Sequence, residues 1–240
     1  MFKHRLNENV SYKTYFDWFL LSFLAGNINA GGWLACQRFV SHVTGFATLS
    51  GIFFEEGKWL EFLGTLSIPF FFLSGVMISG FFSEKKMAEK VHGERFAPVM
   101  SLVALLLFFV AIGGIYNLFG IFGHEAKIES DFILMACLCG ACGLQNGAIT
   151  SASGATIRTT HLTGLTTDLG LGIIRAEVHH LSLEQRAQER RANLLRFGTI
   201  LSFTLGSVIA AFIYVRYKYY GFFFPMGISL YSAWVARKSD

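Results

Sequence analysis

The chain has 240 residues, of which 53% are hydrophobic and 15% charged, and its formal net charge is +4. Soluble domains carry about 25% charged residues, so this composition excludes an ordinary water-soluble protein and predicts an all-α integral membrane protein in a lipid bilayer. The small positive charge gives no support to nucleic-acid binding, because the basic residues stand mostly in short polar segments between apolar ones.

Three membrane spans and one short apolar segment are expected in the first half. A helix needs about 20 apolar residues to cross a bilayer, and stretches near that length cover residues 15–36, 60–82 and 96–122. The stretch 40–54 is shorter, so a broken or re-entrant helix is expected there. The basic residues 1–14 precede an apolar stretch without a clean cleavage site, which favours a retained first span over a signal peptide.

The second half repeats this order. Spans are expected over residues 132–149, 194–215 and 219–234, and a second short apolar segment covers 159–174. The charged stretch 175–196 is expected to form an amphipathic surface helix whose arginines contact anionic headgroups.

Matching segments indicate that the two halves are duplicated units. The matches are HVTG at 42–45 with HLTG at 161–164, Asn29 with Asn146, and residues 72–82 with 203–213. Repeats of this size in a membrane protein are typical of internal pseudo-symmetry. We therefore expect an N-terminal unit over residues 1–125 and a C-terminal unit over 126–240, within one membrane domain.

The distribution of basic residues predicts how the two units are oriented. Six crossings with a cytoplasmic N-terminus place most Lys and Arg residues on the cytoplasmic side, whereas eight crossings distribute them more evenly. The positive-inside bias favours six, with both termini cytoplasmic. Since three spans per unit is an odd number, the second unit is expected to be inverted. The predicted fold is six full spans plus two short broken or re-entrant helices in a 3+3 inverted-topology repeat.

The two His-x-Thr-Gly (HxTG) motifs are expected to begin half-helices that meet near the middle of the bilayer, with Thr44 or Thr163 as the cap. Broken backbone at that depth must face protein or a water-filled cavity, and a helix N-terminus suits an anionic or electron-rich group. The expected substrate-binding residues are Asn29, Arg38, His42, Thr44, Gly45, Gln145, Asn146, Arg158, His161, Thr163 and Gly164. Asp168, the only carboxylate in either motif, is the candidate for ion coupling together with the histidines.

Each of these residues also has a purely structural explanation. Asn and Gln side chains join membrane helices by hydrogen bonds, and glycines permit close packing. Arginines extend to the headgroups, and the two histidines can cap helices without a ligand. Repetition of the same His, Thr and Gly in both halves favours a functional role over packing alone.

No enzyme or metal motif is recognised. The sequence has no HExxH, no GxSxG and no phosphate loop. The cluster CLCGAC at 137–142 has no neighbouring His or Asp, so helix packing by small residues is preferred to a metal or thiol role. We therefore expect no enzyme activity, no cofactor and no metal.

The motifs in their contexts resemble the YoaK-type bacterial membrane proteins, a domain family of unknown function. The segments that carry the resemblance are Asn29-Ala30, FVSHVTGFATLSG, GLQNGA and RTTHLTGLTTDLG. The resemblance covers essentially the whole chain and implies a small multi-pass protein of the bacterial cytoplasmic (inner) membrane. Family members usually carry Asp where this chain has Asn29 and Asn where it has Phe46. If that Asp binds a cation or proton in relatives, this chain has lost the coupling or moved it to Asp168.

Together these observations predict a small-solute membrane transporter or channel, with its site at the repeat interface near the bilayer midplane. The solute is expected to be small and polar or anionic, and six spans around a pathway are compatible with a homodimer. The alternative is a non-transporting membrane scaffold or accessory subunit with a dry, packed centre. A weaker alternative is an intramembrane enzyme, which needs His161 and Asp168 within hydrogen-bonding distance of each other and of a cavity.

Overall fold

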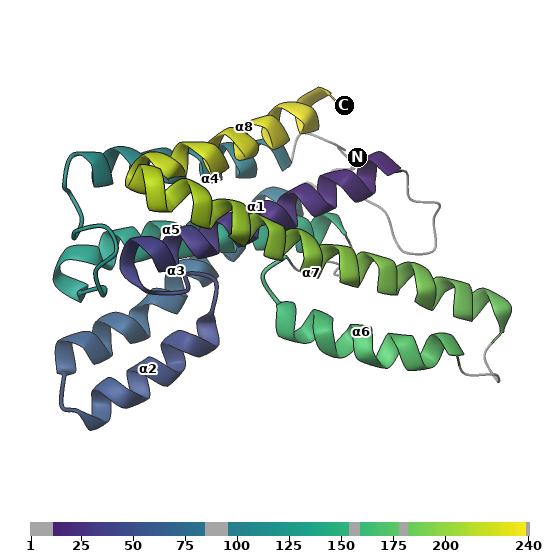
Figure 1. Cartoon of the computed structure of the whole chain (residues 1–240), viewed down its shortest axis with the longest axis horizontal. Coiled ribbons are helices and arrows are strands. Elements are labelled where there is room, and N and C mark those ends of the chain that lie inside the picture. Colours follow the sequence, from purple (N-terminus) through teal and green to yellow (C-terminus); the bar gives the residue numbers. More distant parts are fainter. Residues whose placement is uncertain (1–11, 85–95, 154–158, 178–181, 239–240) are drawn as a thin grey trace.

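All regular structure in the described part of the chain is helical, which confirms the all-α class (Figure 1). The computed structural model describes residues 12–84, 96–153, 159–177 and 182–238. The elements are α1 (Tyr12–Cys36), α2 (Val43–Glu55), α3 (Trp59–Glu84), α4 (Phe96–Ile115), α5 (Ile128–Ala152), α6 (Leu162–Glu177), α7 (Leu183–Tyr217), the 3-10 helix η1 (Lys218–Phe222) and α8 (Phe223–Lys238).

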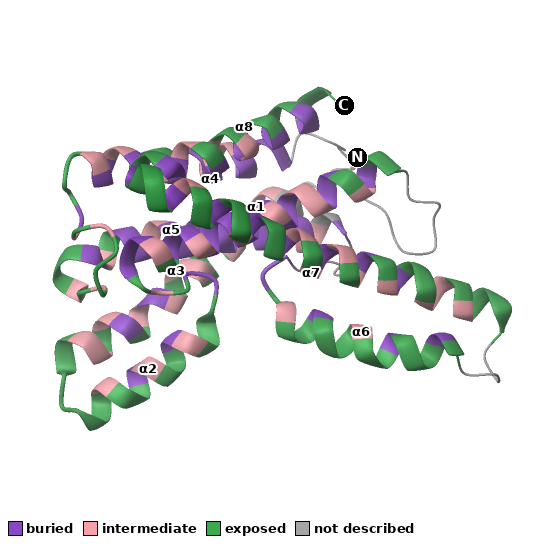
Figure 2. Ribbon diagram, in the orientation of Figure 1, coloured by how far each residue is buried: buried purple, intermediate pink, exposed green. Residues whose placement is uncertain are grey.

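The core is built from three pairs of helices. α1 packs along α7, α3 along α5, and α4 along α8. Buried residues gather where these helices cross in the middle of the molecule (Figure 2). The largest fully buried side chains include Trp18, Tyr214 and Phe222. These six helices therefore share one hydrophobic core.

Two of the pairs meet backbone to backbone at glycine. A Cβ atom added at Gly26 of α1 would overlap the carbonyl oxygen of Phe203 on α7, and one added at Gly143 of α5 would overlap that of Phe72 on α3. Only glycine, which has no Cβ, permits this approach. Phe72 and Phe203 begin the two matching segments found in the sequence. The two matching segments therefore make matching contacts with glycine.

The two short helices contribute little to this core: among the described residues, α2 adds Phe46 to it and α6 adds none. α2 contacts α3 and α6 contacts α7, and neither contacts any other described helix. We call these pairs the α2–α3 arm and the α6–α7 arm; Figure 1 shows them diverging on one side of the molecule. The buried residues are Phe46 and Ser50 in α2, and Leu165, Gly172 and Ala176 in α6. Most of the surface of both helices is therefore exposed (Figure 2).

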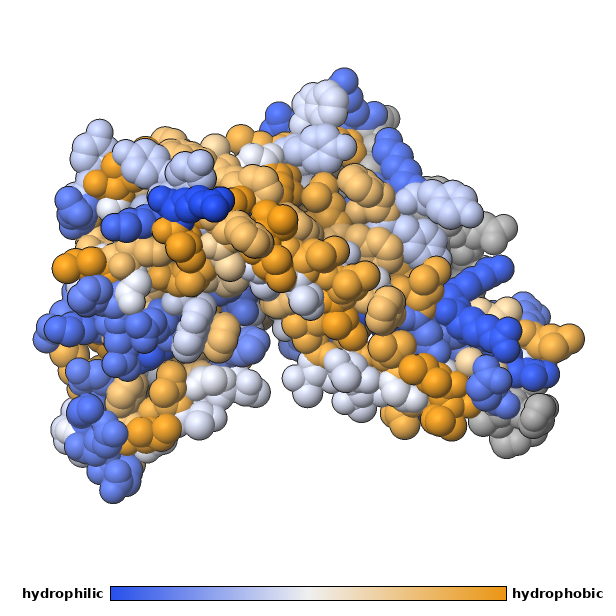
Figure 3. All heavy atoms as spheres, in the orientation of Figure 1, coloured by the Kyte–Doolittle hydropathy of each residue, from blue (hydrophilic) through white to orange (hydrophobic). Residues whose placement is uncertain are grey.

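Five helical segments of the described chain are long and apolar enough to cross a membrane, which confirms a multi-pass membrane protein. They are Tyr12–Cys36, Trp59–Phe82, Phe96–Ile115, Ile128–Ser151 and Leu183–Lys238. The last contains α7, η1 and α8; the chain reverses at Lys218 (φ 48°), and α8 returns alongside α4. Hydrophobic atoms cover the middle of the visible face, and hydrophilic atoms gather towards its left and right ends (Figure 3).

The charged stretch 175–196 does not form a separate surface helix, so that prediction is wrong. α6 continues to Glu177, and α7 then runs unbroken for 35 residues. A capping box begins α7: the Ser182 hydroxyl accepts the N–H of Gln185 (3.1 Å), and the Gln185 side chain accepts the N–H of Ser182 (2.9 Å). With this cap and no helix breaker after it, the charged turns join the apolar part of the helix.

Ion pairs join the charged turns of α7 to one another and to the end of α6. Glu189 of α7 pairs with Arg196 of α7 (3.2 Å) and with Arg175 of α6 (4.0 Å). The pair with Arg175 therefore links α6 to α7 within the α6–α7 arm. α4 also ends earlier than expected, at Ile115, because the chain turns through Asn117 in the left-handed conformation (φ 57°).

Candidate functional site

The first HxTG motif stands where the chain turns from α1 into α2. Gln37 adopts the left-handed conformation (φ 52°), and its N–H donates to the carbonyl of Trp33 (2.8 Å). Its side-chain amide donates to the carbonyl of Gly123 (2.9 Å). Because α2 begins at Val43, residues 37–42 form the whole connection between the two helices. Gln37, the first residue of this connection, is therefore fixed by hydrogen bonds of both its backbone and its side chain.

Asn29 holds the other end of the connection against α1. Its Oδ1 accepts the backbone N–H (3.2 Å) and the hydroxyl (2.9 Å) of Ser41. Both residues are buried, so water does not compete for these bonds. The carbonyl of Val40 also accepts the thiol of Cys139 on α5 (3.0 Å). The predicted binding residue Asn29 thus lies behind the motif and positions it.

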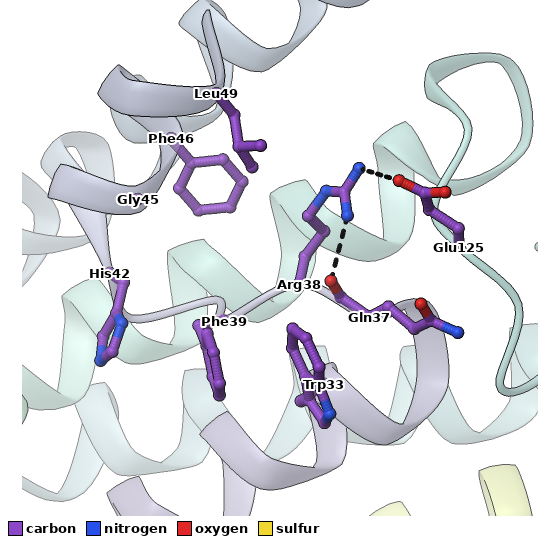
Figure 4. Close-up of a pocket in the computed structure, with 9 residues that line it drawn as sticks. All are labelled: Trp33, Gln37, Arg38, Phe39, His42, Gly45, Phe46, Leu49 and Glu125. Atoms are coloured by element: carbon purple, nitrogen blue, oxygen red, sulfur yellow. Dashed lines mark hydrogen bonds and ion pairs between the residues drawn. The ribbon is translucent and has the colours of Figure 1, made fainter. Parts of the chain in front are cut away.

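A pocket of about 390 Å³ lies beside this connection, between the end of α1 and the beginning of α2 (Figure 4). It brings together three of the predicted site residues, Arg38, His42 and Gly45. The remaining lining residues are Trp33, Gln37, Phe39, Phe46, Leu49 and Glu125. Two of these, Phe46 and Leu49, come from α2, and Glu125 comes from the segment before α5. The pocket therefore combines an apolar wall with a few polar groups.

Arg38 supplies the positive charge of the pocket. Its Nη2 donates to Oε1 of Glu125 (3.1 Å), and its Nη1 donates to the carbonyl of Gln37 (3.1 Å). The Arg38 side chain is 14% exposed and that of Glu125 is 71% exposed. Because a guanidinium has five N–H donors, Arg38 keeps donors for a ligand.

Aromatic rings and an imidazole form another wall of the pocket. The ring centroids of Trp33 and Phe39 lie 4.5 Å apart, with 16° between the ring planes. The Phe39 and His42 rings are 5.0 Å apart. Burial lowers the pKa of His42, so its imidazole is neutral at pH 7. This wall offers flat apolar surfaces and an uncharged imidazole, while the charges of the pocket are those of the ion pair between Arg38 and Glu125.

Each motif histidine directly precedes its helix, and each motif threonine lies inside the first turn. The expectation that Thr44 or Thr163 caps the helix is therefore wrong, because helical backbone already begins at the residue before the threonine. His42 occupies the N-cap of α2 without a side-chain capping hydrogen bond. The carbonyls of Thr44 and Thr163 accept the hydroxyls of Thr48 and Thr167, at 3.0 Å in both motifs. The two motifs thus fold alike.

The second motif lies on the open surface of the α6–α7 arm. Thr163, Gly164 and Asp168 are exposed, and a Cβ added at Gly164 would meet nothing within 4 Å. None of these residues lines the pocket, and neither does His161, which is also exposed. Since α2 and α6 make no contact, the described structure does not bring the two helices together. Arg158 lies outside the described residues.

The predicted amides Gln145 and Asn146 lie in the core rather than in the pocket wall. The Gln145 side chain donates to the carbonyl of Leu21 (2.5 Å), which links α5 to α1. Asn27 similarly links α1 to α7 by donating to the carbonyl of Gly206 (3.4 Å). Gln145 Oε1 and Asn146 Oδ1 are buried acceptors without a hydrogen-bond partner in the described part of the chain. The side-chain nitrogen of Gln145 therefore links two helices, while its side-chain oxygen makes no hydrogen bond among the described residues.

Sequence reasoning missed most of the pocket wall. Trp33 and Phe39 flank Arg38 closely, so the aromatic residues around the motif were the available signal. Glu125 is far along the chain, and no pattern in the sequence relates it to Arg38. Only the turn at residues 116–127, which returns to the end of α1 through hydrogen bonds to Ala35 and Cys36, places it there.

One family model matches the chain, over residues 18–235, and its description is "Protein of unknown function (DUF1275)". This match confirms the family resemblance seen in the motifs. No curated protein and no solved structure matches the chain.

Proposed function

Because the chain belongs to the DUF1275 family, whose function is unknown, we propose a function from its own geometry: a small-solute transporter or channel of the bacterial cytoplasmic membrane. The solute is small and polar or anionic. The pocket beside the first HxTG motif is the proposed binding site, and it carries the proposal. It offers an arginine and an imidazole at the start of a helix that is too short to cross a bilayer.

A 3+3 inverted repeat of residues 1–125 and 126–240 underlies this proposal. Helix α1 pairs with α7, and its equivalent α5 pairs with α3, the equivalent of α7. Two units related by a two-fold axis pair in this reciprocal way, and the glycine contacts of Gly26 and Gly143 follow the same rule. If α7 and α8 cross the membrane separately, the crossings number six and both termini are cytoplasmic. These pairings support the inverted repeat.

α2 and α6 have the length and direction of re-entrant helices. They contain 13 and 16 residues, so they are about 20 Å and 24 Å long, less than the roughly 30 Å thickness of the hydrocarbon core. Figure 1 shows them running from the middle of the molecule towards opposite ends. This arrangement supports a pathway that enters from both faces and is interrupted near the midplane.

The proposed solute follows from the chemistry of the pocket wall. The planar fork of Arg38 matches a planar oxyanion such as a carboxylate or nitrate. The stacked rings of Trp33 and Phe39 suit a flat or apolar part of the same molecule. A volume of about 390 Å³ falls within the range of small-molecule pockets, about 300–1,000 Å³. We therefore propose small monoanions as the first solutes to test.

Thermal stability of the purified protein tests the binding site. Nitrate, acetate and benzoate are added to the wild type, to Arg38→Gln and to Arg216→Gln, a control that removes an exposed arginine outside the pocket. At least one anion is expected to raise the melting temperature of the wild type and of Arg216→Gln, but not of Arg38→Gln. An anion that stabilises all three equally, or none that stabilises any, contradicts the site.

Flux measurements then test transport itself. The anion with the largest effect is followed into proteoliposomes that contain the wild type, Arg38→Gln or no protein. Transport predicts faster uptake with the wild type than in the other two. Equal rates in all three contradict transport even if the anion binds.

The competing proposal is a membrane scaffold, and the core amides favour it. Asn27 and Gln145 both join helices by hydrogen bonds, as a purely structural role requires. A scaffold predicts no anion effect on stability and no flux. The two experiments above therefore separate the proposals.

A further inference from the structure

A second cavity opens on the side of the core, between α3, α4 and α5. Its volume is about 440 Å³, and its lining includes Phe71, Gly75, Leu106, Phe132, Cys137 and Gly140. The one hydroxyl in the lining, that of Ser74, already donates to the carbonyl of Phe70 in its own helix (2.8 Å). The groove therefore offers no polar group that would hold a polar ligand.

The groove exists because the two units differ at this place. In the alignment of the units, Ala136 and Gly140 of α5 take the positions of Phe19 and Phe23 of α1. This is the alignment that matches Asn146 with Asn29. Small residues thus line the groove where the other unit carries two phenylalanines.

Those two phenylalanines fill the equivalent surface of the first unit. The Phe23 ring lies 6.3 Å from that of Phe224 on α8, edge to face at 68°. The Phe19 ring lies against Gly198 of α7, close enough to overlap any Cβ there. In the first unit, phenylalanine side chains therefore bridge α1 to α7 and α8. In the second unit, the equivalent space between α5, α3 and α4 is left open.

We propose that this groove binds an acyl chain of a membrane phospholipid. All three helices are candidate spans, so the groove lies at the depth of the hydrocarbon. The exposed side chains of Phe70, Leu105 and Ile133, from α3, α4 and α5, make the surface around the groove apolar and continuous with the lipid-facing surface. Protein interiors are close-packed, so space that phenylalanines fill in one unit takes apolar atoms in the other. At this depth those atoms come from lipid.

Filling the groove tests the proposal. Gly140→Phe restores the residue type of the other unit, and a Cβ at Gly140 approaches Leu106 and the Phe71 carbonyl only to 3.8 Å. Gly80→Phe is the matched control, because a Cβ at Gly80 of α3 meets nothing within 4 Å. After purification in detergent, phospholipid is extracted and quantified against protein. The wild type and Gly80→Phe are expected to retain phospholipid in a fixed molar ratio, and Gly140→Phe to lose it. Equal retention by all three, or none by the wild type, overturns the proposal.

A second measurement needs no variant, so the proposal stays testable if Gly140→Phe does not fold. Cys137 lines the groove and is partly exposed, whereas Cys36, Cys139 and Cys142 are buried. Alkylation of Cys137 by N-ethylmaleimide is followed by peptide mass spectrometry, with and without added palmitoyl-oleoyl phosphatidylglycerol. The lipid is expected to slow alkylation of Cys137. An unchanged rate overturns the proposal.

Discussion

Asn29 and Ser41 are joined by two hydrogen bonds across the turn from α1 to α2, both accepted by one side-chain oxygen of Asn29. Asn146, which the sequence match pairs with Asn29, has a buried Oδ1 without a hydrogen-bond partner among the described residues. One oxygen therefore sets where the first HxTG motif lies, while its counterpart makes no such bond.

Asn29→Ala is expected to destabilise the protein more than Asn146→Ala. Removing Asn29 leaves the buried N–H and hydroxyl of Ser41 without an acceptor, at a cost of about 1–3 kcal/mol. Thermal unfolding in detergent measures both variants side by side. Equal melting temperatures, or a lower one for Asn146→Ala, contradict the positioning role.

Glu125→Gln is expected to strengthen anion binding in the pocket. The carboxylate of Glu125 competes with a ligand for Arg38. Two unit charges about 4 Å apart interact by about 1 kcal/mol even in water, so the affinity for nitrate should rise about fivefold. Glu56→Gln, which removes the exposed ion pair with Lys58 (2.7 Å) outside the pocket, is the control. Titration of melting temperature with nitrate measures both; unchanged or weaker binding by Glu125→Gln refutes this competition.

Gly26→Ala and Gly143→Ala are expected to impair folding. Their added methyl groups would overlap backbone carbonyls, and overpacking of this kind costs about 1–3 kcal/mol or more. Gly51→Ala and Gly170→Ala, on the open surfaces of α2 and α6, are the controls. A Cβ at either meets nothing within 4 Å, so stability should be unchanged or rise by about 0.5–1 kcal/mol. Yield of monodisperse protein and melting temperature report the effect. Loss of folding in the two controls would contradict the open surfaces of α2 and α6 on which this comparison depends.

Nitrate binding is expected to strengthen as the pH falls below the ordinary pKa of histidine, about 6.5. Burial lowers the pKa of His42, so the imidazole is neutral at pH 7 and gains its charge only in more acidic solution. In the absence of anion, the free energy of unfolding is expected to fall as the pH is lowered. The reason is that His42 binds a proton at a higher pH in the unfolded chain than in the folded protein. Nitrate does not titrate in this range. Melting curves from pH 7.5 to 5 with and without nitrate, for the wild type and His42→Gln, measure both effects, and identical profiles for the two proteins contradict the role of His42.

Asp168→Asn tests ion coupling in the second motif. A carboxylate exposed at membrane depth is costly unless it is paired or protonated, which makes Asp168 the candidate to carry a proton. If the protein couples transport to protons, anion uptake into proteoliposomes driven by a pH gradient should stop in Asp168→Asn, while exchange of anion at equal pH continues. Glu177→Gln, at the end of the same helix, is the control. Gradient-driven uptake by Asp168→Asn at the wild-type rate rules out this role.

The sequence predicts the broad fold well because lipid imposes simple rules. Apolar length located the candidate spans, and the matching segments pointed to residues that proved to lie at equivalent helix contacts, as with Phe72 and Phe203. The charged beginning of α7 misled the prediction because a change from charged to apolar residues does not end a helix. The capping box at Ser182 begins one helix that runs through both parts.

The pocket was only partly predictable from the sequence. Arg38, His42 and Gly45 are near neighbours in the chain, so one motif contained them all. Glu125 reaches Arg38 through a turn whose own hydrogen bonds run to the end of α1, and local patterns carry no information on that. The expected capping by Thr44 failed because it depended on where helical backbone begins, which propensity alone predicts only to within a residue or two.

The arrangement of the arms has a consequence for local opening. α2 and α6 each rest on one helix and bury few side chains, so detaching either one exposes little apolar surface. The free energy of such a sub-global opening is lower than that of unfolding the whole chain. Amide hydrogens of α2 and α6 should therefore exchange with deuterium well before those of α1 and α5, whose helices are largely buried. In the proposed transporter, the segments that begin with HxTG would then be the first to rearrange on solute binding.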